Sequence, residues 1–165
     1  MAPDHSMSAM LTAAPTPKAV RDLLGELLGR TPQVAPGVPY ASGLAEPATH
    51  AVYVDQRMRT RAVVSADLRC SAYLAATAGR LPAGALEDVW KQRRLAPALA
   101  GHLDRVLEGL APLFGGQVRR YASYPPASEP PTDVAAFARA LGNRLDLAVG
   151  FAQYGIGRLS FVAVP

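Results

Sequence analysis

The segment from Pro97 to Phe114 is the feature that most restricts how this chain can fold. Five apolar residues recur in it at helical spacing: Leu99, Leu103, Val106, Leu110 and Leu113. Because a helical turn takes about 3.6 residues, these side chains share one face, and that face needs an apolar surface to pack on. The sequence predicts an amphipathic helix that Pro97 opens and Gly115 and Gly116 close.

Two apolar strand pairs can supply that surface. The first joins residues 50–54 and 60–65 through a polar stretch, which is the composition of a hairpin with a turn longer than two residues. The second joins residues 145–153 and 158–164 around two glycines that permit the positive φ of a turn. Both pairs predict antiparallel strands.

Capping residues and apolar periodicity complete the order of elements. Further helices are predicted at 17–28, 68–77, 85–93 and 132–141. A single strand is predicted at 117–124, and residues 31–49, which hold four prolines, are predicted as an irregular connector. This order predicts an α+β fold with a mainly antiparallel sheet and helices packed on one face.

The length of 165 residues fits one domain, predicted at 17–165, which can bury roughly two-thirds of its unfolded surface. Residues 1–16 have no basic segment followed by a long apolar run, so they predict a flexible N-terminal tail and not a signal peptide. No apolar run approaches the roughly 20 residues that cross a bilayer. Cys70 is the only cysteine, which excludes an intrachain disulfide. We expect a cytoplasmic protein without membrane contact.

Asp104, Glu108 and Ala111 share the polar side of the 97–114 helix. This helix resembles the signature helix of the CheC/CheX chemotaxis phosphatases, whose pattern is Asp or Ser, three residues, Glu, two residues, Asn. The resemblance implies a CheX-like fold, shared at the level of element order over residues 18–164. Ala111 stands at the Asn position, and the chain's single asparagine, Asn143, lies elsewhere.

The resemblance also implies a chemistry. In that family the carboxylate docks on a phosphorylated CheY-like receiver and the amide orients the water that hydrolyses the aspartyl phosphate, with the receiver's own magnesium. Alanine has no amide group with which to orient the water, so the catalytic motif is degenerate. Asp104 and Glu108 are then candidates for partner binding, or they form a solvated helix face paired with a nearby arginine.

A second pair of carboxylates, Asp22 and Glu26, repeats the same spacing in the first helix, with Gly29 at the amide position. Family members of the CheC type carry the pattern twice, so these residues are also candidates for partner binding. Amphipathic helices rich in leucine place carboxylates four residues apart by default, so a coincidental repeat of the spacing is the alternative explanation.

Other chemistries lack a motif. The histidines, His5, His50 and His102, show no metal-ligand spacing, so neither a metal nor a cofactor is predicted. The sequence contains no elbow that would expose a nucleophilic serine. The alternating Arg57, Arg59 and Arg61 could project from one face of a strand toward phosphates, but no exposed aromatics interleave with them, so no nucleic-acid binding is predicted.

Three functions follow from these observations. The first is a non-catalytic signalling or regulatory protein on a CheC/CheX-like scaffold, which binds a CheY-like receiver, another signalling protein or a second copy of itself. The second is an aspartyl-phosphate phosphatase that relies on Glu108 alone. The third is an α+β domain unrelated to chemotaxis.

Overall fold

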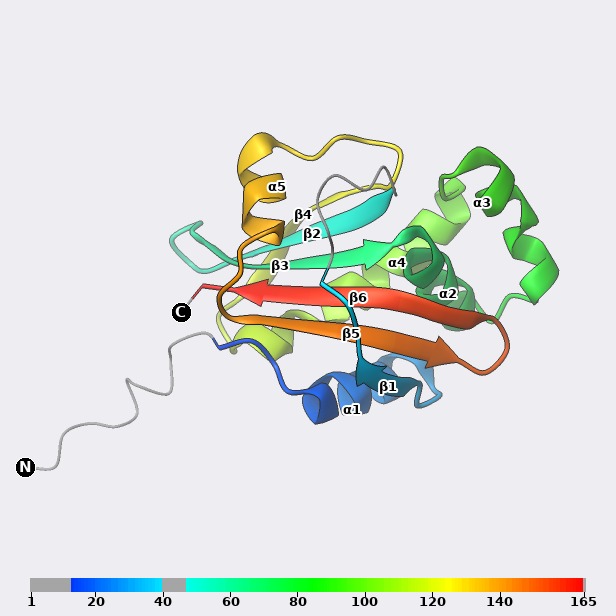
Figure 1. Ribbon diagram of the computed structural model, residues 1–165, viewed down its shortest axis with the longest axis horizontal. Helices are drawn as coiled ribbons and strands as arrows, with labels where there is room; N and C mark the ends of the chain where they lie inside the picture. The colour runs from blue at the N-terminus through cyan, green and yellow to red at the C-terminus, as the bar shows by residue number, and fades with distance from the viewer. Residues whose placement is uncertain (1–12, 40–46, 165) are drawn as a thin grey trace, which may run out of the picture.

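A six-stranded antiparallel sheet forms the centre of the structure, a computed structural model that describes residues 13–39 and 47–164 (Figure 1). The strands are β1 (Gln33–Pro36), β2 (Ala48–Val54), β3 (Thr60–Asp67), β4 (Arg119–Tyr124), β5 (Arg144–Phe151) and β6 (Gly155–Ala163). They are arranged in the order β1-β5-β6-β3-β2-β4. The two predicted hairpins, β2–β3 and β5–β6, are confirmed. The predicted tail lies outside the described residues over its first twelve positions.

Strand β1 contradicts the prediction of an irregular connector over residues 31–49. Gln33 to Pro36 pair with Gly150 to Leu147 of β5. Proline is tolerated here because β1 ends the sheet, so a missing N–H on its free side breaks no ladder. Residues 40–46 of the predicted connector lie outside the part of the chain that the structure describes.

Seven helical segments connect the strands in the described ranges. They are α1 (Pro17–Leu28), α2 (Leu68–Gly79), η2 (Ala83–Leu86), α3 (Glu87–Gln92), α4 (Pro97–Gly109), η3 (Ala111–Phe114) and α5 (Thr132–Ala138), where η marks a 3-10 helix. Two side chains cap helix starts: Thr16 Oγ1 accepts from the Ala19 N–H at 3.1 Å, and Asp67 Oδ1 accepts from the Cys70 N–H at 2.8 Å. No helix among the described residues combines the length and apolarity that a membrane span requires.

The main core lies between one face of the sheet and α1, α2 and α4. Its completely buried side chains include Leu24, Leu74 and Leu107, one from each of these helices. The short helix α5 covers part of the opposite face, where its residues pack on a smaller cluster from β2 and β3. All of β2 is buried as a result. The predicted α+β class with a mainly antiparallel sheet is confirmed, and α5 adds a helix on the second face of that sheet.

The predicted helix over residues 97–114 is interrupted, which contradicts its predicted C-terminal end. Helix α4 stops at Gly109, and a separate 3-10 turn, η3, follows. The cause is Pro112, which has no N–H for the carbonyl of Glu108 and whose ring would clash with that carbonyl in a continuous helix. The chain therefore turns at Leu110, whose N–H donates to the carbonyls of Val106 at 3.1 Å and Leu107 at 3.3 Å.

Candidate functional site

The two carboxylates of α4 converge on one arginine of the edge strand β4. Arg120 Nη2 lies 2.8 Å from Glu108 Oε1, and Arg120 Nη1 lies 3.6 Å from Asp104 Oδ1. Arg120 Nη1 also donates to Ser123 Oγ at 2.9 Å. We call Asp104, Glu108 and Arg120 the α4–β4 charge cluster. The arginine pairing that the sequence allowed for these carboxylates is thereby confirmed.

Strand register explains why Arg120 reaches α4. Arg120 is the cross-strand partner of Tyr53 in β2, so both side chains lie on the sheet face that α4 covers. Tyr53 is fully buried, and its hydroxyl donates to the carbonyl of Leu107 at 2.5 Å. This bond holds the C-terminal part of α4 against the sheet, and it keeps Asp104 and Glu108 close to Arg120.

The electrostatic environment differs across the cluster. The side chains of Asp104 and Glu108 keep 51% and 64% of their surface exposed, whereas that of Arg120 keeps 17%. The guanidinium is thus partly buried and paired with two carboxylates that still face solvent, while its Nε has no hydrogen-bond partner among the described residues. Burial raises the pKa of Tyr53; the charge of Arg120 opposes that rise and the charge of Glu108 adds to it. The carboxylates of Asp104 and Glu108 are paired with Arg120 on one side, and on the other side they face solvent, where a partner can reach them.

Ala111 does not share this face, which contradicts the prediction from helical spacing. It is the first residue of η3, is only 9% exposed and belongs to the main core. The prediction failed because the helix ends two residues earlier, so the periodicity that relates Asp104 to Glu108 does not extend to residue 111. An amide placed there would point into the core and not toward a receiver.

We therefore expect Ala111→Asn to lower the free energy of unfolding by about 1 to 3 kcal/mol, because a buried amide without partners is costly and adds volume to a packed core. Urea titration of purified protein measures the loss. Arg105→Asn is the matched control, since Arg105 is exposed on α4, and it should change stability by less than about 0.7 kcal/mol. An Ala111→Asn protein as stable as wild type would show that residue 111 lies at the surface and not in the core.

Asp22 and Glu26 form a separate surface on α1. Asp22 lies 2.9 Å from Lys18 Nζ, and chiefly this hydrogen bond, with the charges of Lys18 and Arg21, lowers the pKa of Asp22. Glu26 is exposed. Within the described ranges, no hydrogen bond or ion pair links either residue to the α4–β4 charge cluster. The two predicted sets of carboxylates therefore do not meet in one site.

The predicted arginine row of the first hairpin does not form. Arg57 and Arg59 lie in the turn between β2 and β3, where their backbone N–H groups donate to Asp55 Oδ1 at 2.8 and 3.0 Å. Only Arg61 lies in a strand. These hydrogen bonds, led by that from Arg59, lower the pKa of Asp55. Because Arg57 and Arg59 lie in a turn, the three arginines do not alternate along one strand and do not form a shared phosphate-binding face.

Other reactive groups in the described residues are structural. Cys70 is buried in the core, and burial, with the charge of Asp67, raises the pKa of its thiol, so it is a poor nucleophile. Across residues 13–39 and 47–164, no group of three or more His, Cys, Asp or Glu side chains is placed to hold a metal ion. The α4–β4 charge cluster is therefore the strongest candidate site derived from the sequence motif.

Comparison with known proteins gives structural likeness without sequence likeness. No protein-family model and no curated protein matches the chain. A chain of the FliG–FliM complex from H. pylori matches with a TM-score of 0.64 and 10% identity, over 97% of this chain and 91% of that one. The CheX–CheY–BeF3–Mg complex from Borrelia burgdorferi matches with a TM-score of 0.55 and 11% identity, over 90% of this chain and 94% of that one.

A third match is FliY from Thermotoga maritima, with a TM-score of 0.51 and 10% identity, over 99% of this chain and 91% of that one. These identities show the fold alone. The chain has the fold shared by CheX, FliM and FliY, and the resemblance inferred from the sequence is confirmed at that level.

Proposed function

We propose that this chain is a non-catalytic, cytoplasmic binding protein of a chemotaxis or flagellar signalling assembly, and that its docking surface is the α4–β4 charge cluster. The observation that carries the proposal is the state of the signature helix. Its two carboxylates remain on a solvent-facing surface, whereas the position of the amide is a buried alanine in a different helix. Docking groups are retained and the water-orienting group is lost.

The cluster is suited to protein recognition for two further reasons. Arg120 holds both carboxylates in place, so a partner would meet a preorganised acidic surface, with less side-chain entropy to lose. Electrostatic complementarity at such a surface favours a basic patch on the partner. Solved complexes of this fold contain CheY, FliG or SpeE as the second protein, which supports a signalling or flagellar protein as the partner. A second copy of this chain is the alternative partner.

An aspartyl-phosphate phosphatase is the second candidate function. It is favoured by the spacing of Asp104 and Glu108 on an exposed helix of a CheX-like fold. In this reading Glu108 would position the receiver, and water would lack an amide to align it. Since alignment of the nucleophile accounts for a large part of such a rate, binding without turnover is the better-supported function.

Binding measurements test the proposal. We expect the purified chain to bind either a BeF3-activated CheY-like receiver or a FliG-type protein from the same genome in isothermal titration calorimetry. Replacing the docking charges with Asp104→Asn and Glu108→Gln should weaken that binding about tenfold or more, because hydrogen bonds to charged groups contribute about 1.5 to 3 kcal/mol. Glu129→Gln is the matched control, since Glu129 is exposed in the linker before α5.

Three results would contradict the proposal. The first is no binding to either partner, and the second is wild-type affinity in the doubly substituted protein. The third is an equal loss of affinity in the Glu129→Gln control. Sedimentation velocity on the free chain distinguishes self-association from binding to a different protein.

A further inference from the structure

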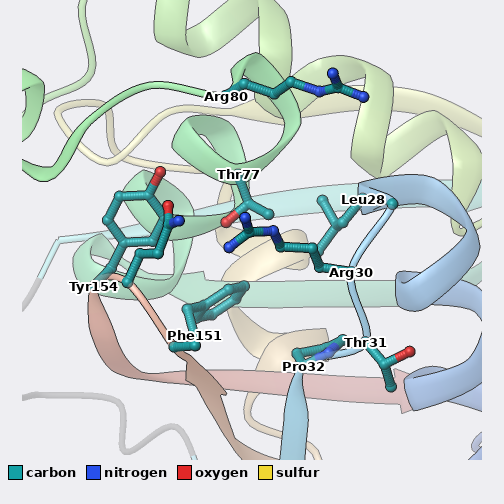
Figure 2. Close-up of a pocket in the computed structure, with 11 residues that line it drawn as sticks. Leu28, Arg30, Thr31, Pro32, Thr77, Arg80, Phe151 and Tyr154 are labelled. Atoms are coloured by element: carbon teal, nitrogen blue, oxygen red, sulfur yellow. The ribbon is translucent and has the colours of Figure 1, made fainter.

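A cavity of about 410 Å³ lies at the other end of the helical layer, between the C-termini of α1 and α2 and the β5–β6 turn (Figure 2). It belongs to the β1–β5 side of the sheet, whereas the α4–β4 charge cluster lies at the β4 edge. Its lining combines Arg30, Thr77, Arg80, Phe151 and Tyr154 with backbone of the α1–β1 connection. The size is within the range of about 300 to 1,000 Å³ typical of small-molecule sites.

Arg30 is the central polar group of this cavity. Figure 2 shows its side chain extending from the α1–β1 connection into the space between Thr77, Phe151 and Tyr154, while Arg80 lies along the rim. The guanidiniums of Arg30 and Arg80 have no hydrogen bond or ion pair with any residue that the structure describes. A guanidinium with free donors in a concave site is matched to carboxylate or phosphate oxygens, which it binds through two parallel hydrogen bonds.

Two hydroxyls of residues that line this cavity can only accept further hydrogen bonds. Thr77 Oγ1 donates to the carbonyl of Tyr73 at 2.7 Å, and the Tyr154 hydroxyl donates to the carbonyl of Leu81. Each hydroxyl has one proton, so each keeps only lone pairs for a ligand. The cavity thus presents donors for an anion on Arg30 and acceptors for N–H or O–H groups on the opposite wall.

The wall behind these hydroxyls is aromatic. Tyr154 stacks on Tyr73 with ring centroids 5.7 Å apart and an interplanar angle of 14°, and Phe151 lies 5.7 Å from the same Tyr73 ring. Stacked rings are rigid and offer apolar area to a flat ligand at little entropic cost. A simpler role for the arginines is to balance the negative ends of α1 and α2. That role requires neither a cavity nor an aromatic wall, and it leaves the donors of both guanidiniums free.

We propose that this cavity binds a small organic anion that carries a flat ring. The carboxylate or phosphate lies on Arg30 with Arg80 at the rim, the ring packs on the wall of Phe151 and Tyr154, and ring substituents donate to the hydroxyls of Thr77 and Tyr154. Nucleoside monophosphates and aromatic carboxylates share this chemistry. The inference does not depend on the α4–β4 charge cluster or on the proposed docking function.

Isothermal titration calorimetry of the full chain with named probes tests this site. The anionic ring probes are AMP, GMP and 4-hydroxybenzoate. Two controls each lack one feature: adenosine has the ring without an anion, and inorganic phosphate has the anion without a ring. We expect at least one anionic ring probe to bind with a Kd below about 1 mM, a modest affinity for a ligand of this size. Adenosine and phosphate should each bind about tenfold or more weakly. The identity of the bound probe distinguishes nucleotide from aromatic carboxylate.

Arg30→Gln should weaken binding of that probe about tenfold or more, since it removes the guanidinium charge and its paired hydrogen-bond donors. Arg105→Gln, an exposed arginine on α4, should leave affinity unchanged. Backbone NMR of the wild-type chain gives a readout that needs no variant: probe binding should shift amides of residues 28–32 and 151–154 and not those of 104–109. Absence of binding by every anionic ring probe, unchanged affinity in Arg30→Gln, or shifts confined to other regions would overturn the proposal.

Discussion

Replacing Leu110 with alanine is expected to lower the free energy of unfolding by about 2 to 5 kcal/mol, the range for truncating a large buried aliphatic side chain. Leu110 is fully buried at the junction of α4 and η3. Its N–H closes the last turn of α4, and its carbonyl accepts from the Leu113 N–H at 3.0 Å. A cavity at this point would loosen both segments at once. Denaturant titration followed by circular dichroism measures the effect.

Glu108→Ala is the control for this experiment because Glu108 lies on the opposite face of the same helix. Its side chain is 64% exposed and its ion pair with Arg120 is at the surface, so its removal should change stability by less than about 1 kcal/mol. The two variants should therefore differ clearly. Equal destabilisation by both would show that the assigned buried and exposed faces of α4 are wrong.

Gly157→Ala is the second substitution with a large expected effect. A Cβ at Gly157 would lie 2.5 Å from both the backbone N and the Cα of Cys70, in the first turn of α2. Backbone atoms cannot move aside as a flexible side chain can, so β6 and α2 would have to separate. Overpacking of this kind costs about 1 to 3 kcal/mol and sometimes more, and we expect a loss of about 3 kcal/mol or more here.

Asp67 joins the same two elements, so their separation would cost further stability. Its Oδ1 accepts from the Cys70 N–H at 2.8 Å and from the Arg158 N–H at 3.1 Å, so one carboxylate joins the start of α2 to β6. Separation of the two elements would break that link. Thermal unfolding measures the loss, and Gly150→Ala is the matched control because its Cβ would meet its nearest neighbour at 3.5 Å. A Gly157→Ala protein as stable as Gly150→Ala would contradict the close approach.

Local signals in the sequence predicted much of the fold. The caps Thr16 and Asp67 act within a few residues of their own position, so their side chains identify helix starts directly. The two hairpins are equally local. Strand β1 was missed because it is short, contains Pro36 and gains its hydrogen bonds from β5, which lies far along the chain. Pairing of that kind leaves little trace in the pattern of the strand itself.

The candidate site was only partly predictable. Spacing placed Asp104 and Glu108 on one helix face, but the role of Arg120 depends on the register of β4 against Tyr53 of β2, which the sequence of either strand does not fix. The error at Ala111 had a local signal. Pro112 has no N–H to donate to the carbonyl of Glu108, and weighing it would have ended the predicted helix at or before Ala111.

The lifetime of the aspartyl phosphate on a CheY-like receiver tests the proposed absence of catalysis most directly. The receiver is phosphorylated, and its loss of phosphate is followed with and without this protein at a substoichiometric amount. We predict the same rate in both samples, because position 111 is a buried alanine that presents no amide beside Asp104 and Glu108, and positioning of the nucleophile is worth several orders of magnitude in rate. A large acceleration with multiple turnovers would contradict it.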